Sequence, residues 1–325
     1  MFRRSNIKLS LAVFVFTAAI LSIVQLKLDN PIIILERFIR GGGWIEIFVI
    51  SFYGALVAYK MHNTSNVVQW RRYTWILFSV VFFSQLILGI VGFEKFLMTG
   101  RLHLPIPVMI LSGPVYRGQI SIMTILFLST IVLSGPAWCS HLCYFGALDG
   151  LAARGKTRKG IIKNKLAIKY TLLLFVIVIT LVLRWLGIPV LVSTIAAIAF
   201  GVLGIILILI LSAGKGKMYH CILYCPISTV VNYLRFINPF RLYIDRNCTL
   251  CMKCTIYCKY DALNTEDIKR NKPAVTCTLC GDCLSSCKEN SIKYRFLKFN
   301  PDTSRNLYLF ITISIHAVFL ALARI

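Results

Sequence analysis

Charged side chains are scarce in this chain. Asp, Glu, Lys and Arg make up 15% of its 325 residues, whereas hydrophobic residues make up 58%. A soluble protein of this length needs more polar surface, so the composition predicts a membrane protein. Acidic residues are the rarer charged type, 12 against 36 lysines and arginines, and the formal net charge is +24. Such a balance indicates nucleic-acid binding only when it covers one soluble face.

The long apolar segments also lack charge at their centres. Glu46, Lys169 and Arg184 lie near the ends of such segments. A central charge costs about 2.5–3.5 kcal/mol to insert and would mark an ion path, so we expect no proton pump. Only His316 lies well inside an apolar segment, and no C-x-x-C-H motif is present. These two absences argue against a membrane bis-histidine haem pair and against c-type haem.

Seven apolar segments each approach the roughly 20 residues that cross a bilayer. The first follows a short basic N-terminus, and we expect a retained helix because no small-residue cleavage site of a signal peptide follows it. The fifth and sixth are joined by a tight turn at Gly187-Ile188-Pro189. The seven segments are Leu9 to Leu26, Trp44 to Met61, Tyr73 to Gly92, Gln119 to Trp138, Leu166 to Gly187, Ile188 to Ala213 and Asn306 to Ile325.

The basic residues predict the orientation. With the N-terminus inside, segments 1–8, 60–72, 139–169 and 213–305 are internal, and they hold 28 of the 36 lysines and arginines. Cytoplasmic segments of membrane proteins are enriched in these residues. We therefore expect a multi-pass protein of a prokaryotic cytoplasmic (inner) membrane, with residues 213–305 in the cytoplasm. This bias accounts for the positive charge without nucleic acid, and the surplus suits anionic lipid or an acidic electron-donor protein.

Eight of the twelve cysteines lie in a repeat between Cys248 and Cys287. Each half has the spacing C-x-x-C-x-x-C-x-x-x-C, and both begin with C-T-L-C. Three thiolates on one loop can hold three corners of an iron–sulfur cube, and the fourth usually reaches a second cube. A zinc site would leave the third cysteine of each half unexplained, and disulfides between such close neighbours would be strained. The spacing therefore predicts two [4Fe–4S] clusters.

Residues 241–296 resemble a bacterial-type two-cluster ferredoxin. The resemblance implies a short strand from Arg241 to Arg246, a binding loop and a helix, and then the same order again. Lys259 and Lys288 stand where that family usually has proline, a departure that affects loop geometry and potentials. The resemblance implies one cluster held by Cys248, Cys251, Cys254 and Cys287, and another held by Cys277, Cys280, Cys283 and Cys258.

The other four cysteines form two C-x-x-x-C pairs after the fourth and sixth apolar segments. On a continuing helix, positions i and i+4 share a face, so each pair could present two sulfurs. We expect them to converge on a third iron–sulfur cluster or on one tetrahedral metal such as copper(I) or zinc; the alternative is that they are buried small hydrophobes. His141 and His220 would donate hydrogen bonds or accept protons beside this site, or be plain polar residues. The four cysteines are Cys139, Cys143, Cys221 and Cys225.

Over residues 70–300 the chain resembles the membrane-bound polyferredoxins, which carry twin C-x-x-x-C-P motifs followed by a two-cluster ferredoxin. That group includes the quinol dehydrogenase of nitrate reduction, the nitrous-oxide-reductase accessory protein and the cupric reductase of cytochrome oxidase assembly. Tyr144 stands where the first motif would have proline, and the flavin-binding domain of some members is missing. The resemblance implies an electron-transfer subunit of an oxidoreductase, between the quinone pool and a redox partner. The alternatives are a metal-handling assembly factor, for example one that reduces copper, and a redox-sensing regulator.

The expected fold is mostly α, with about seven transmembrane helices and a cytoplasmic α+β ferredoxin-like domain, carrying the two [4Fe–4S] clusters, inserted before the last helix. The expected domains are a six-helix membrane domain at 1–225, the ferredoxin-like domain at 226–300 and a last transmembrane helix at 301–325.

The segment from Phe93 to Gly118 is expected to be an external loop at the membrane interface. It carries Glu94, Arg101, His103 and Arg117 beside a proline-broken apolar stretch. Irregular backbone at membrane depth must be covered by protein or line a cavity. A contact with a partner or with a quinone headgroup is the functional alternative.

Overall fold

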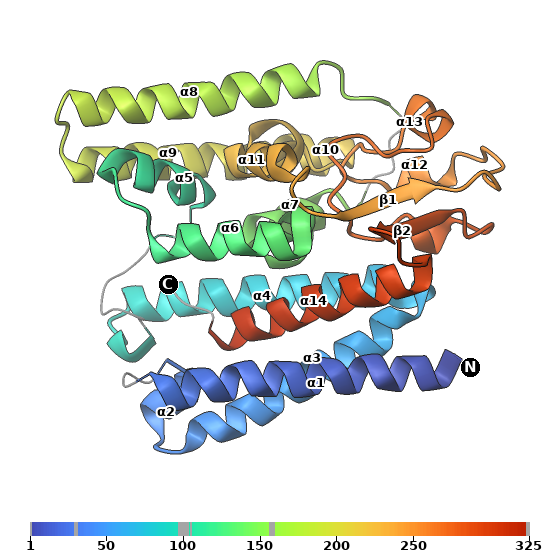
Figure 1. Ribbon diagram of the computed structural model, residues 1–325. Helices are drawn as coiled ribbons and strands as arrows, with labels where there is room; N and C mark the ends of the chain where they lie inside the picture. The colour runs from blue at the N-terminus through green and yellow to red at the C-terminus, as the bar shows by residue number, and fades with distance from the viewer. Residues whose placement is uncertain (1, 29–31, 97–103, 105, 156–159, 323–325) are drawn as a thin grey trace. The chain divides into compact units, whose positions relative to one another are not determined.

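The computed structural model describes residues 2–28, 32–96, 104, 106–155 and 160–322. It is mostly helical (Figure 1). The chain divides into two compact units, one of residues 1–105 with 294–325 and one of residues 106–293. All twelve cysteines belong to the second unit. Arg101 and His103 of the predicted external loop lie outside the described residues.

The first unit is a bundle in which the C-terminal helix α14 packs against α1 and α3 from the other end of the chain. Helix α14 begins where the Asn300 side chain accepts a hydrogen bond from the Thr303 amide at 2.7 Å, with Pro301 in its first turn, a typical helix start. The elements are α1 (Phe2–Lys27), α2 (Ile34–Phe38), α3 (Gly42–His62), η1 (Thr64–Asn66), α4 (Val67–Ile90), η2 (Glu94–Phe96) and α14 (Pro301–Ala321).

The second unit joins long helices to a cysteine-rich segment (Figure 1). Its short helices α5 and α11 pack against each other and against α8. The elements are α5 (Pro107–Arg117), α6 (Ile122–Ser134), η3 (Gly135–Ala137), η4 (Trp138–Leu142), α7 (Tyr144–Ala152), α8 (Lys165–Trp185), α9 (Val190–Leu207), η5 (Ile208–Ser212), α10 (Ala213–Lys215), η6 (His220–Tyr224), α11 (Pro226–Leu234), β1 (Phe240–Ile244), α12 (Lys253–Tyr257), α13 (Thr265–Lys269) and η7 (Leu284–Ser286). Strand β2 (Ile292–Phe296) begins in the second unit and ends in the first.

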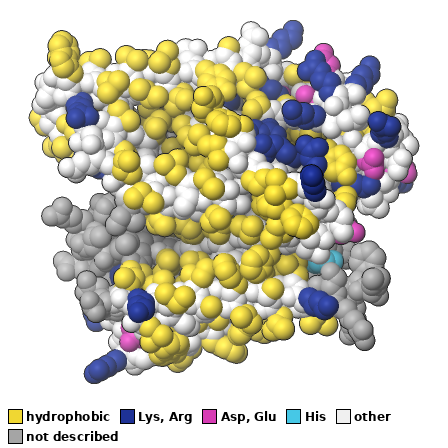
Figure 2. Space-filling view, in the orientation of Figure 1, with side chains coloured by type: hydrophobic (Ala, Val, Ile, Leu, Met, Phe, Trp, Pro, Cys, Tyr) yellow, Lys and Arg dark blue, Asp and Glu magenta, His cyan; other side chains and the backbone are white. Residues whose placement is uncertain are grey.

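Within the described residues, seven helices are long and apolar enough to cross a membrane, which confirms the predicted number. Large apolar side chains such as Leu174, Leu191 and Leu209 point outward from them, and apolar side chains cover much of the visible face of the long helices (Figure 2). Lipid can accommodate such a surface. The seven candidate spans are Asn6–Lys27, Gly42–His62, Thr64–Ile90, Met123–Leu142, Lys165–Trp185, Val190–Lys215 and Pro301–Ala321.

Part of the predicted external loop is helical. Helix α5 runs from Pro107 to Arg117, contains Pro114, and is followed by Gly118 in the left-handed conformation (φ +68°). Proline is tolerated in the first turn of a helix, and glycine favours the position after its end. The prediction of a loop throughout Phe93–Gly118 is therefore wrong for residues 107–117, which are helical. Because α5 packs against α8, α9 and α11, its backbone is covered by protein, as membrane depth would require.

The cysteine-rich segment departs from the expected order of elements. Strand β1 lies where the first strand was predicted, and it pairs with β2, which follows the last cysteine. No strand precedes the second cysteine loop in this described segment; helix α13 is there instead. Asn264 and Asp267 form a reciprocal capping box at its start, which stabilises a helical turn and explains the error. The predicted domain limits also differ from the two compact units, and they stay predictions.

Candidate iron–sulfur sites

The two C-T-L-C loops have matching backbones. Leu250 and Leu279, which precede the second cysteine of each loop, both have φ +56°. Met252 and Gly281, which follow it, have φ +59° and +81°. Two left-handed residues in such a short stretch turn the chain sharply, so three cysteines fall on each loop. The local repeat seen in the sequence is therefore also a repeat of conformation.

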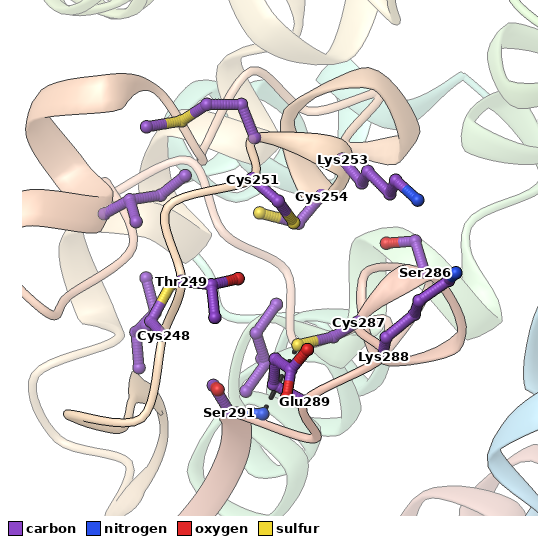
Figure 3. A pocket seen from close by; sticks show the side chains of 14 residues that line it. Cys248, Thr249, Cys251, Lys253, Cys254, Ser286, Cys287, Lys288, Glu289 and Ser291 are labelled. Carbon is purple, nitrogen blue, oxygen red and sulfur yellow. Dashed lines mark hydrogen bonds between the residues drawn. The ribbon is translucent and has the colours of Figure 1, made fainter.

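The first loop lines a pocket together with the last cysteine of the repeat. The sulfur atoms of Cys248, Cys251, Cys254 and Cys287 face this shared space (Figure 3). Burial, together with the other three thiols, raises the pKa of Cys254 to about 11. Cys251 is exposed and the other three are half-buried. We call these four cysteines the surface set.

The second loop gathers with Cys258 in the same way. Burial raises the pKa of Cys283 well above its usual value, and Cys280, Cys277 and Cys258 add to the effect. The sulfur of Cys258 accepts a hydrogen bond from the amide four residues later at 3.3 Å, and so does that of Cys287. We call these four cysteines the middle set. The structure thus brings together the two groups of four that the ferredoxin resemblance implies.

The C-x-x-x-C pairs repeat each other in three dimensions. Both occupy π-helical turns, closed by hydrogen bonds from the Cys143 amide to the Trp138 carbonyl and from the Cys225 amide to the His220 carbonyl. Cys143 (φ −82°, ψ 115°) and Cys225 (φ −73°, ψ 114°) then each start a nine-residue helix. The prediction of a continuing α-helix is therefore wrong, because in each segment the backbone amide bonds the carbonyl five residues earlier and not four.

The two pairs meet at one place. The thiol of Cys221 lies within electrostatic range of Cys143, Cys225 and Cys139, and none of the four is more than 8% exposed. We call them the membrane set, because Cys139 falls in the candidate span Met123–Leu142. Burial raises the pKa of Cys143 to about 12. Such thiols stay protonated at neutral pH, so a metal would have to displace their protons to bind.

Two ionisable residues beside the membrane set were not predicted as site residues. The Asp149 carboxylate accepts a hydrogen bond from the Cys221 amide at 2.9 Å, and burial raises its pKa to about 6. Lys169 is 2% exposed and lies within electrostatic range of Cys139, Cys225 and Cys221. The available signal for Asp149 was its position as the only acidic residue of the internal segment 139–169. Lys169 was visible only as a charge near a span end.

The two histidines have different surroundings. A ring nitrogen of His141 lies 2.9 Å from the hydroxyl of Ser140, the residue that follows Cys139. The His220 ring stacks on Phe145, with centroids 5.6 Å apart, and packs against Gly204. Burial lowers the pKa of His220 to about 4, which favours the neutral ring at pH 7. Their predicted role toward metal-bound sulfurs stays a prediction.

Hydrogen bonds connect the middle set to the membrane set. Tyr260, two residues after Cys258, donates its hydroxyl proton to the Cys139 carbonyl oxygen at 3.0 Å. The Ser140 hydroxyl donates to the carbonyl oxygen of Thr278 at 3.2 Å, inside the second C-T-L-C loop. All these groups are buried. Two direct hydrogen bonds therefore join the segment of the middle set to the segment of the membrane set.

Each of the three sets supplies four sulfur donors. Among the described residues, no three Cys, His, Asp or Glu side chains converge tightly enough to hold one metal ion. Ligands of a single tetrahedral ion must all lie about 2.3 Å from it, whereas the four thiolates of a [4Fe–4S] cluster bind four different irons and are spread more widely. Three sets of four soft sulfur donors are compatible with iron–sulfur chemistry.

The family comparison falls on the membrane set. Residues 119–169 match the family model of a 4Fe-4S binding domain. This match and the many cysteines support an iron–sulfur protein. The matched stretch contains Cys139 and Cys143 but neither Cys221 nor Cys225, so on its own it supplies only two thiolates. No curated protein and no solved structure shows a significant match to the chain.

Proposed function

We propose that this chain is a multi-pass membrane electron-transfer protein that passes electrons between the quinone pool and a redox partner. In this proposal the surface and middle sets each hold a [4Fe–4S] cluster, and the membrane set holds a third iron–sulfur centre. Clusters of this kind exchange single electrons when bound. The family match at 119–169 supports the iron–sulfur part.

The observation that carries the proposal is the decrease in exposure from one set to the next. The surface set includes an exposed cysteine, the middle set is half-buried or buried, and the membrane set is fully buried. The bonds from Tyr260 to Cys139 and from Ser140 to Thr278 join the last two sets. Such an order suits electron transfer between a partner at the surface and a carrier in the membrane.

The proposed membrane carrier is a quinol, and the proposed location is a prokaryotic cytoplasmic membrane with the cysteine-rich segment inside. The distribution of lysine and arginine supports this orientation. Lysines and arginines gather around the cysteine-rich end of the second unit on the face that Figure 2 displays. A basic surface of this kind favours an acidic redox partner or anionic lipid headgroups.

Iron content and EPR spectra test the function. The purified full-length protein would be reduced first with a quinol analogue and then with dithionite. We expect iron and sulfide for three centres, with at least one EPR signal developing under the quinol analogue. Cys139→Ser and Cys221→Ser, from different halves of the membrane set, should both remove the same centre and leave the other two.

The same experiment separates the electron-transfer function from metal handling. If the C-x-x-x-C variants lose bound copper or zinc while all iron signals persist, the membrane set belongs to a metal-handling protein. Complete absence of reduction by the quinol analogue would contradict a link to the quinone pool.

A further inference from the structure

Lys169 is a buried ammonium group in an apolar helix. It lies in α8, inside the candidate span Lys165–Trp185, and only 2% of it is exposed. Further along the same helix, Leu174 and Val178 are exposed apolar residues. A charged amine in such a place is costly unless a compensating charge lies close by. An anionic partner would offset this cost.

The hydrogen-bond partners of Lys169 are all neutral. Its amine donates to the Ser228 hydroxyl at 2.9 Å and to the Cys221 carbonyl oxygen at 3.4 Å. The Asn232 amide, turned so that both its ends are satisfied, accepts at 2.7 Å. Within the described part of the chain, the ion pairs formed by Asp and Glu do not involve Lys169. These contacts hold the amine in place but leave its charge uncompensated.

The groups that can supply negative charge are the cysteines of the membrane set. Lys169 lies within electrostatic range of Cys139, Cys225 and Cys221, so it faces both C-x-x-x-C pairs. The Ser228 hydroxyl, which accepts a hydrogen bond from the amine, also lies close enough to Cys139 to influence its thiol. Four neutral thiols would offer this cation little, whereas four thiolates on a metal centre would carry net negative charge.

We infer that Lys169 is the counter-cation of an anionic centre at the membrane set and raises the reduction potential of that centre. This inference rests on the proposed third centre. A fixed positive charge nearby stabilises the more negative, reduced form, and the low polarity of the surroundings strengthens the effect. Lys169 is thus a positioning residue that acts on the potential through its charge and not as a ligand.

The test is a redox titration of the purified full-length protein, followed by EPR, for wild type, Lys169→Met and Lys169→Arg. Lys163→Met is the matched control, because Lys163 is exposed six residues earlier and its charge is screened by solvent. We expect Lys169→Met to weaken one-electron reduction of one centre at least tenfold, a decrease of about 59 mV. Lys169→Arg should restore most of the loss, and Lys163→Met should change nothing.

The outcomes distinguish this inference from the proposed function. If wild type lacks a third centre, both fail. If wild type has the centre and Lys169→Met leaves its potential unchanged, only the role of Lys169 is wrong. Loss of the centre in Lys169→Met with retention in Lys169→Arg supports the counter-cation, whereas equal loss in both variants overturns it, because charge would then not be the deciding property.

Discussion

The Tyr260 hydroxyl donates a hydrogen bond to the backbone carbonyl oxygen of Cys139 at 3.0 Å, across 121 residues of sequence. Both residues are buried. The bond therefore joins a residue beside the middle set to a member of the membrane set.

Removing this hydroxyl should weaken the connection without removing a ligand. Tyr260→Phe leaves the Cys139 carbonyl without this donor, so we expect a loss of about 1–3 kcal/mol in unfolding free energy. Electron transfer to the membrane set should slow while iron content stays constant. Thermal unfolding in detergent and rapid-mixing reduction would measure the two effects. Tyr257→Phe, at an exposed tyrosine, is the control, and equal behaviour of both variants would contradict the prediction.

The crossed grouping of the ferredoxin cysteines predicts reciprocal damage. Cys258→Ser should disrupt the cluster held by the second loop, because Cys258 lies with Cys277, Cys280 and Cys283. Cys287→Ser should disrupt the other cluster, because Cys287 lines the pocket of the first loop. EPR spectra of the two variants should lose different signals. Loss of the same signal in both would show that each half keeps its own fourth cysteine.

Asp261 is a buried carboxylate that pairs with two lysines. It forms ion pairs with Lys165, at 2.9 Å, and with Lys217, and its side chain is 1% exposed. Asp261→Ala would leave both ammonium groups without this partner, and breaking a buried pair costs about 3–5 kcal/mol. We expect a clearly lower unfolding temperature in detergent. Glu266→Gln, which removes an exposed pair with Arg270, should leave that temperature unchanged.

The predicted orientation places Lys272 and Leu186 on opposite sides of the membrane. A membrane-impermeant thiol reagent applied to intact cells should label Leu186→Cys, in the turn after α8, and should not label Lys272→Cys. Both positions should react after the cells are opened, and the unaltered protein measures the background from its own cysteines. Labelling of Lys272→Cys in intact cells would show that the predicted orientation is wrong.

Properties that depend on neighbouring residues could be predicted from the sequence. Hydropathy is such a property, so the seven apolar segments predicted all seven candidate spans, although the third span begins at Thr64 and not at Tyr73. The two C-T-L-C loops are another case, since cysteine spacing and tight turns are local. Two local predictions were wrong. The segments at Cys139 and Cys221 form π-helical turns where a continuing α-helix was predicted, and residues 107–117 form helix α5 where a loop was predicted.

Contacts between distant residues were decided only by the tertiary structure. The convergence of the two C-x-x-x-C pairs was a positional hypothesis, and packing of the helices brings them together. Nothing local to Lys169, Asp149 or Tyr260 indicates which of them faces a cysteine, because that depends on helix rotation and on how the cysteine-rich segment folds against the helix ends. Spacing therefore determined which cysteines can act together on one loop, and packing determined which charges and hydrogen bonds surround them.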